Sequence, residues 1–236
     1  MARHPLQRLA SPSRQVSMLL HTAGIVSFLA SFRFLAHWET PISASFGGHY
    51  QFLTIIGLAL ALATFSIGLA ADLTLSPALF QAKNSLAVCS APLEILISIL
   101  FWGLCAIDKN LVFPPDSELD FIPNFGFHAA PGLFLAVDLL LLSPPWTIDG
   151  FAAVALSQSF AFLYWFWVEY CYRQNGWYPY PIFDLLSTWQ RMLLFAFSAF
   201  LMTGSTMLLK WLYRKVNRGA PETIGNNSTD VRIKSE

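Results

Sequence analysis

The sequence predicts an all-α protein, a polytopic membrane helix bundle of about six transmembrane helices with both termini in the cytosol. Two observations support this prediction. Hydrophobic residues make up 55% of the 236 residues and charged residues only 12%, roughly half the charged fraction of a soluble domain. The apolar residues also gather into six stretches, each long enough for the roughly 20 residues that a membrane-spanning helix needs.

The six stretches are separated by short segments that contain proline, glycine and charged residues. The first follows a polar N-terminus with Arg3 and Arg8, and no clear cleavage site comes after it, so we interpret it as a retained helix rather than a signal peptide. The fourth is the weakest, because Pro131 and Asp138 interrupt it. The predicted spans are 17–37, 51–71, 85–106, 124–143, 150–172 and 188–213, with breaks predicted at 38–50, 72–84, 107–123, 144–145 and 176–181.

Lysine and arginine residues are distributed unevenly between the two predicted membrane faces. If the N-terminus lies inside, ten of the 14 fall on the inner side, Lys83 in the 72–84 loop among them. The other four, Arg33, Lys109, Arg173 and Arg191, lie on the outer side. Since positive residues favour the cytosolic side, both termini are predicted there. The expected domains are a cytosolic segment 1–16, a transmembrane domain 17–215 and a polar, disordered cytosolic tail 216–236.

Composition and spacing exclude several classes of function. Basic and acidic residues are equal at 14 each, which gives no basic excess for nucleic acid. The three cysteines are far apart and fit neither a disulfide framework nor a CxxC metal site. The five histidines form no closely spaced pair, which argues against a metal centre of the membrane desaturase type.

Ionisable side chains inside predicted spans are costly and therefore point to functional sites. They are Arg33, Glu94, His128, Asp138, Glu169 and Arg191. The predicted topology places Thr54 about 5 Å below the outer end of the second span and His128 about 6 Å below that of the fourth. The same outer half of the predicted membrane domain also contains Glu169, Arg173, Arg191 and Arg33. Glu94 and Asp138 lie deeper, as an interhelical polar pair or a proton path, and we favour the pair.

A hydroxyl beside an imidazole is the minimal set for nucleophilic acyl transfer, because the imidazole removes the proton of the hydroxyl. Asn124 or a guanidinium would then supply the oxyanion donor. Ordinary structural roles compete with this interpretation. A membrane threonine commonly bonds the carbonyl one turn back, here that of Tyr50. A single histidine often only packs between helices, and arginines often extend to lipid headgroups.

Three segments carry a resemblance to a known family. They are FGGHYQFLT (46–54), NFGFHAAP (124–131) and YWFWVEYCYRQNGWYPYPIFD (164–184). In order and spacing they resemble the androgen-induced protein family, over roughly residues 17 to 215. The resemblance implies a multi-pass membrane hydrolase that cleaves fatty acid esters of hydroxy fatty acids with a threonine nucleophile and a histidine.

Carried onto this chain, the family threonine falls on Thr54 and the family histidine on His128. The match departs at Ala129, where animal members tend to carry a hydroxyl, and at Phe125, where a polar residue is expected. Both positions flank the predicted base and bear on substrate preference. Asn124, Glu169, Arg173 and Arg191 remain candidate oxyanion or supporting residues. Trp177, Tyr178 and Tyr180 are expected to roof the site.

The leading hypothesis is thus an intramembrane lipid ester hydrolase that needs no cofactor or metal. Its expected partners are a lipid ester substrate and membrane lipids, without nucleic acid. Its expected location is the endoplasmic reticulum or another endomembrane rather than the plasma membrane. The alternative is a non-enzymatic membrane protein, either a small-molecule transporter or a regulatory subunit, since a hydrolase has no evident need for Glu94 and Asp138.

Overall fold

The computed structural model describes residues 14–38, 40–113 and 119–217. In that part of the chain the secondary structure is helical, with connecting turns and loops and no strand. Five helices are long and apolar enough to cross a membrane: α1 Arg14–His37, α2 Leu53–Thr74, α3 Pro77–Ile107, α6 Gly150–Asn175 and α8 Thr188–Val216. A bent pair, α4 Phe121–His128 and α5 Ala130–Leu142, makes a sixth span if it is counted as one. The prediction of about six transmembrane helices is therefore confirmed. Of the predicted terminal segment 1–16 and tail 216–236, residues 1–13 and 218–236 lie outside the described residues.

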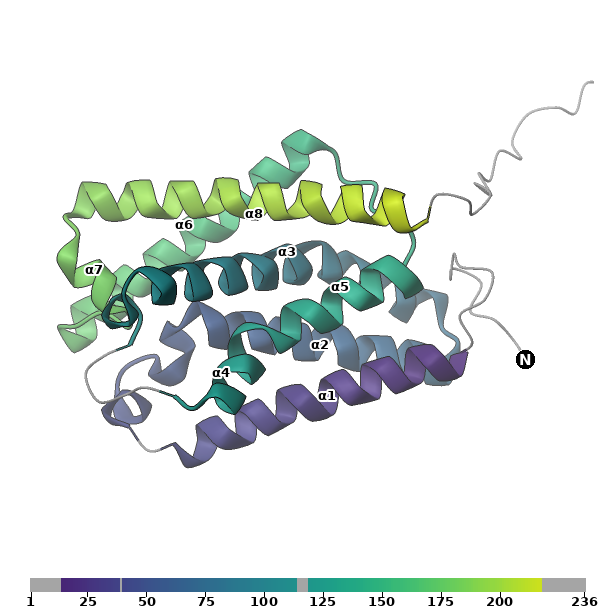
Figure 1. Ribbon diagram of the computed structural model, residues 1–236, viewed down its shortest axis with the longest axis horizontal. Coiled ribbons are helices and arrows are strands. Elements are labelled where there is room, and N and C mark those ends of the chain that lie inside the picture. The colour runs from purple at the N-terminus through teal and green to yellow at the C-terminus, as the bar shows by residue number, and fades with distance from the viewer. Residues whose placement is uncertain (1–13, 39, 114–118, 218–236) are drawn as a thin grey trace, which may run out of the picture.

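Helix α3 is central to the bundle and packs against α2, α5 and α8 (Figure 1). Helices α1 and α2 pack together on one side, and α6 packs against α8 on the other. The start of α1 and the end of α8 lie at the same end of the bundle, and α4 and the short helix α7 Pro181–Leu185 lie at the opposite end. We call the end with α4 and α7 the loop end. Which end faces the cytosol stays a prediction.

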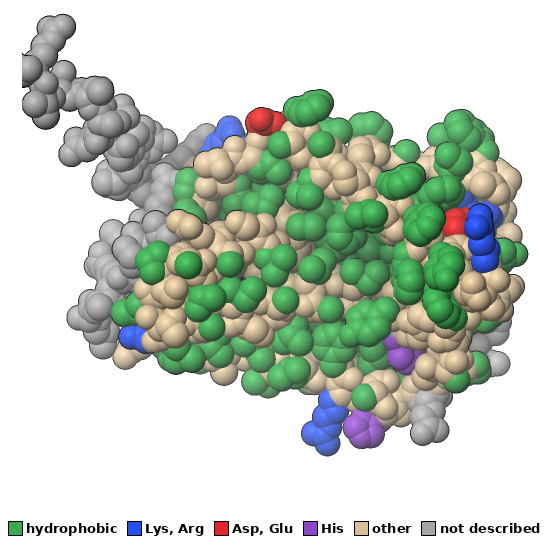
Figure 2. Space-filling view, turned by 180° about the vertical axis from the view of Figure 1, so that it is seen from behind, with side chains coloured by type: hydrophobic (Ala, Val, Ile, Leu, Met, Phe, Trp, Pro, Cys, Tyr) green, Lys and Arg blue, Asp and Glu red, His purple; other side chains and the backbone are tan. Residues whose placement is uncertain are grey.

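Apolar side chains spread over most of the surface seen in Figure 2, and the few charged ones lie toward its rim. Large hydrophobic residues such as Phe162, Phe166 and Phe200 are more than half exposed. Such a surface would be unfavourable in water, whereas lipid tails solvate it at no cost. The surface therefore agrees with a bundle embedded in a bilayer.

The prediction of a loop at residues 72–84 is wrong. Helix α2 continues to Thr74, and α3 already begins at Pro77 after a turn at Leu75, whose φ is 57°. The hydroxyl oxygen of Ser76 accepts from the backbone N–H of Leu79, and proline is favoured at the first helical position. Ser-Pro is thus a helix start here, and Lys83 lies buried within a helix rather than in an exposed loop.

Four buried charged side chains from four helices meet near the end of the bundle opposite the loop end. His21 of α1 contacts Asp72 of α2 through Nδ1 at 2.7 Å and Asp138 of α5 through Nε2 at 3.1 Å. The second oxygen of Asp138 lies 2.7 Å from Lys83 Nζ of α3. Each of the four side chains is at most 2% exposed. We call His21, Asp72, Lys83 and Asp138 the charge quartet.

The quartet corrects the predicted pairing of Glu94 with Asp138. Asp138 is bound by Lys83 and His21, whereas both carboxyl oxygens of Glu94 are buried without a hydrogen-bond partner among the described residues. Glu94 instead packs against Gly57, where an added Cβ would come within 2.5 Å of Glu94 Oε1. The depth of the two carboxylates was estimated from their spans, but depth does not determine which helix faces which.

Asp138→Asn is expected to destabilise the protein by about 3–5 kcal/mol, because it leaves Lys83 without its counter-charge in a buried site. Glu94→Met is the matched control, since it replaces a buried carboxyl that has no partner with an apolar side chain of similar length. Thermal unfolding of the purified protein in detergent measures both. Equal loss of stability in the two variants would contradict the structural role given to the quartet.

Candidate active site

Thr54 lies in the first turn of α2, just after a glycine turn. Gly47 and Gly48 both have positive φ, at 81° and 48°, and they direct the chain into the short helix Gly48–Gln51 that precedes α2. The span begins at Leu53, two residues later than predicted, so Thr54 lies closer to the loop end than expected. The predicted bond to the Tyr50 carbonyl is not formed, and that carbonyl accepts from Trp167 Nε1 at 2.9 Å.

His128 is the last residue of α4, at the break between the two halves of the fourth span. Ala129 leaves helical geometry, with φ −135°, and Pro131 follows at the start of α5. Proline has no N–H and its ring crowds the preceding turn, which accounts for the 41° bend. The carbonyl of His128 is bound by Ser98 Oγ of α3 at 2.6 Å. The break predicted from Pro131 thus falls directly after the histidine.

The surroundings of the His128 ring leave one nitrogen available as a base. Nδ1 lies 3.1 Å from the backbone oxygen of Asn124. Because a carbonyl can only accept, Nδ1 carries the proton and Nε2 has the free lone pair. The ring stacks on Phe101 with 3.4 Å between the centroids and 3° between the planes. These contacts hold the ring in the tautomer that a general base requires.

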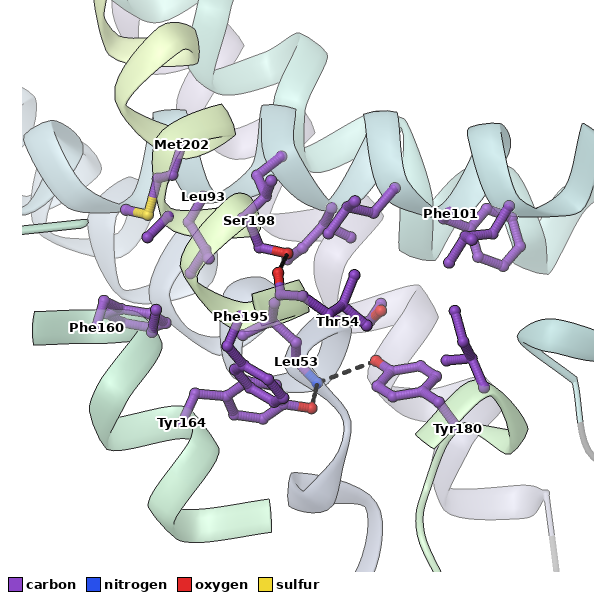
Figure 3. Close-up of a pocket in the computed structure, with 18 of the residues that line it drawn as sticks. Leu53, Thr54, Leu93, Phe101, Phe160, Tyr164, Tyr180, Phe195, Ser198 and Met202 are labelled. Atoms are coloured by element: carbon purple, nitrogen blue, oxygen red, sulfur yellow. Dashed lines mark hydrogen bonds between the residues drawn. The ribbon is translucent and has the colours of Figure 1, made fainter. Parts of the chain in front are cut away.

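Thr54 lines two adjoining cavities. The first, of about 110 Å³, lies between α2, α3, α6 and α8 and has an almost entirely apolar lining (Figure 3). The second, of about 70 Å³, lies toward α1 and α4 and contains His128 and His49 as well as Thr54. The two cavities share four of their lining residues, Thr54, Phe101, Val112 and Tyr180. The hydroxyl and the imidazole that were predicted to share a depth therefore share a cavity.

The four predicted supporting residues line neither cavity. Asn124 donates from Nδ2 to the Leu119 carbonyl at 2.7 Å. Arg191 bonds Glu169 Oε1 through Nε at 3.1 Å and the Leu186 carbonyl through Nη1 at 2.6 Å. Arg173 makes no hydrogen bond with any described residue. Asn124, Glu169 and Arg191 thus fix the backbone around the cavities and are not placed to contact a bound molecule.

The predicted roof of aromatic residues is correct only for Tyr180, because Trp177 and Tyr178 do not line the cavities. The Tyr178 hydroxyl donates to Glu169 at 3.1 Å, and its burial together with this bond raises its pKa to about 12. Tyr178 therefore stays protonated and joins α6 to the segment that carries Tyr180. We call residues 176–187, which connect α6 to α8 and include α7, the aromatic loop.

Sequence reasoning missed three further groups at the site. Tyr164 of α6 donates to the Gln51 carbonyl at 2.9 Å and accepts from the backbone N–H of Leu53 at 3.0 Å. Ser98 holds the His128 carbonyl, as described above. His49 stacks on Trp38 and bonds Ser43, and burial lowers its pKa, so it is neutral at pH 7. Only Tyr164 had a signal in the sequence, as a hydroxyl inside an aromatic span.

Arg191→Met is expected to loosen the aromatic loop, because it removes the partner of Glu169 and the donor to two loop carbonyls. The expected cost is about 1–3 kcal/mol of unfolding free energy, with faster limited proteolysis within 176–187. Arg173→Met is the matched control at the same end of the bundle and should change neither measurement. Unchanged proteolysis of the Arg191 variant would show that the loop is held by other contacts.

Sequence similarity to known proteins covers most of the chain. Residues 16–214 match the FAR-17a/AIG1-like protein family. A Schizosaccharomyces pombe protein described as a UPF0641 membrane protein is 31% identical over 206 residues, which cover 86% of this chain and 92% of that protein. The human androgen-induced gene 1 protein is 24% identical over 195 residues, which cover 74% of this chain and 77% of that protein. No solved structure matches the chain.

Proposed function

Because the chain belongs to the FAR-17a/AIG1-like family, we propose that it is an intramembrane hydrolase of fatty acid esters of hydroxy fatty acids, with Thr54 as nucleophile and His128 as base. One observation carries the proposal. Thr54 and His128 come from helices far apart in the sequence, yet they line one cavity near the loop end. The free Nε2 of His128 and the buried hydroxyl of Thr54 are the two groups that acyl transfer requires.

In the proposed reaction His128 Nε2 takes the proton of Thr54 Oγ1 as the oxygen attacks the ester carbonyl. The tetrahedral intermediate collapses, and His128 returns the proton to the oxygen of the departing hydroxy fatty acid. A water molecule, deprotonated by His128, then attacks the acyl-threonine. The second collapse restores the Thr54 hydroxyl and releases the fatty acid, so no cofactor is consumed.

The two cavities support a substrate with two apolar arms joined near Thr54. The larger cavity extends from Thr54 past Leu93 and Phe160 to Met202 and has the lining that an acyl chain needs (Figure 3). The smaller one, with His49 and Trp38, suits the arm that bears the alcohol oxygen. In this proposal the ester enters from the leaflet at the loop end of an endomembrane.

The alternative function, a transporter or regulatory subunit, rested on Glu94 and Asp138. Asp138 is neutralised within the quartet, and neither it nor Glu94 lines the two cavities at Thr54. One observation still favours this alternative function: the carboxyl group of Glu94 is buried and has no hydrogen-bond partner among the described residues.

Thr54→Ala and His128→Ala are each expected to fold and to lose ester hydrolysis by at least about 10³-fold, as for other paired nucleophiles and bases. Thr64→Ala and His37→Ala are matched controls. Thr64 is a buried threonine of the same helix whose hydroxyl bonds the Leu60 carbonyl, and His37 is an exposed histidine that lines neither cavity. A fluorophosphonate probe should label the native protein at Thr54. Full turnover in either test variant would refute the mechanism.

Met202→Trp is expected to shift hydrolysis toward esters with shorter acyl chains, because the larger ring fills the far part of the apolar cavity. Insertion into a packed region costs about 1–3 kcal/mol, so thermal unfolding should be measured alongside. Leu208→Trp is the control, since that side chain of the same helix is 46% exposed on the lipid-facing surface. An unchanged chain-length profile in the Met202 variant would place the acyl chain elsewhere.

A further inference from the structure

The first turn of α2, which carries Thr54, has no local cap. Its N-cap residue, Phe52, has no side-chain oxygen to accept from the free backbone N–H groups. Two tyrosines from distant parts of the chain accept from the first of them instead. The N–H of Leu53 donates to the hydroxyl oxygen of Tyr164 at 3.0 Å and to that of Tyr180 at 3.1 Å (Figure 3).

Both hydroxyls accept from the same backbone N–H, that of Leu53, but they differ in their other surroundings. The proton of Tyr164 is given to the Gln51 carbonyl at 2.9 Å. Tyr180 lines both of the cavities that meet at Thr54. Tyr164 is therefore committed to the backbone, whereas the side chain of Tyr180 lies at the place where the proposed reaction occurs.

We propose that Tyr180 is the oxyanion donor of the site, an assignment that rests on the proposed function of Thr54 and His128. When Thr54 Oγ1 attacks, the ester carbonyl oxygen becomes negatively charged within reach of groups that surround Oγ1. The Tyr180 hydroxyl, which lines the same cavities as Thr54, donates a hydrogen bond to this oxygen. No proton is transferred.

Three features favour Tyr180 as this donor. Its oxygen accepts from the backbone N–H of Leu53, and acceptance of a hydrogen bond strengthens the donor on the same hydroxyl. It lies at the N-terminus of the 22-residue helix α2, whose dipole favours negative charge there. Burial raises the pKa of Tyr180, so the donor stays protonated. The residues predicted for this role, Asn124 and the guanidiniums, line neither cavity.

The ring of Tyr180 is also held rigidly. It packs edge-on against Phe52, with 5.3 Å between centroids, and against Phe183 at 5.6 Å. The ion pair of Arg191 with Glu169 fixes the aromatic loop on the other side. A donor held in place before the reaction needs no reorganisation when charge develops, which is the condition for strong transition-state stabilisation.

Tyr180→Phe tests the assignment, and Tyr164→Phe is its matched control, because each removes one hydroxyl that caps Leu53. Tyr180→Phe is expected to lower kcat by roughly 10²-fold with a small change in KM. It should weaken binding of a fatty trifluoromethyl ketone, which forms an oxyanion on Thr54, by a similar factor. Tyr164→Phe keeps the ring that lines the larger cavity; it should lower the melting temperature and reduce kcat and ketone binding far less than Tyr180→Phe does.

The results of these experiments distinguish failure of the proposed function from failure of the oxyanion assignment. If Thr54→Ala keeps full turnover, the proposed function fails and the oxyanion assignment falls with it. If Thr54 is essential but Tyr180→Phe turns over and binds the ketone like the native protein, only the oxyanion assignment fails. Equal losses of turnover in the Tyr180 and Tyr164 variants would also overturn it, because both hydroxyls would then act only as helix caps.

A second replacement covers the case in which Tyr180→Phe does not fold. Fluorotyrosine at position 180 keeps the ring and the hydroxyl but makes the phenol more acidic. The alkaline limb of the pH–rate profile should then move to lower pH, as the donor is lost to phenolate formation. His49, His128 and Tyr164, the other ionisable groups that line the cavities with Tyr180, are unchanged by this replacement. An unmoved alkaline limb would overturn the assignment.

Discussion

The fourth span breaks between His128 and Pro131, where the regular helical hydrogen bonds are interrupted. The carbonyl of His128 accepts a hydrogen bond from Ser98 of the neighbouring helix α3. In a bilayer an unpaired backbone carbonyl is expensive, so a break of this kind persists only where another helix supplies a donor. The break ends α4 at the histidine and turns that segment away from the axis of α5. Without it the segment of His128 would continue along the axis of α5, and the stacking of the imidazole on Phe101 of α3 would be lost.

The bundle divides into two regions with different physical demands. Toward the end where α1 begins, the quartet balances two carboxylates against a lysine and a histidine, with serine hydroxyls bound to both carboxylates. Every charge there has a partner, which makes this end a fixed connection among four helices. At the loop end the polar groups are spaced around cavities, and the start of α2 is capped by distant side chains. Rigidity at one end permits open space at the other.

Hydropathy and turn residues were enough to predict the number of spans and most of their limits, because burial in lipid leaves a long apolar signal in the chain. The 72–84 loop was mispredicted because Ser76 and Pro77 open a helix as readily as they mark a turn. The depth argument paired Thr54 with His128, since both lie near the same end of their spans. It could not find the partners of Asp138 and Arg191, or the absence of one for Glu94 among the described residues, because these depend on how each helix is rotated about its axis.

The caps of α2 also bear on the order in which the protein is assembled. The backbone groups at Leu53 find their partners in Tyr164 and Tyr180, which lie 111 and 127 residues further along the chain. During synthesis the second span enters the membrane well before either hydroxyl has left the ribosome. Its first turn therefore waits, uncapped or bound to water, until the fifth span and the aromatic loop arrive. The nascent chain completes this turn only near the end of translation, so a truncated product retains several spans but lacks the finished site.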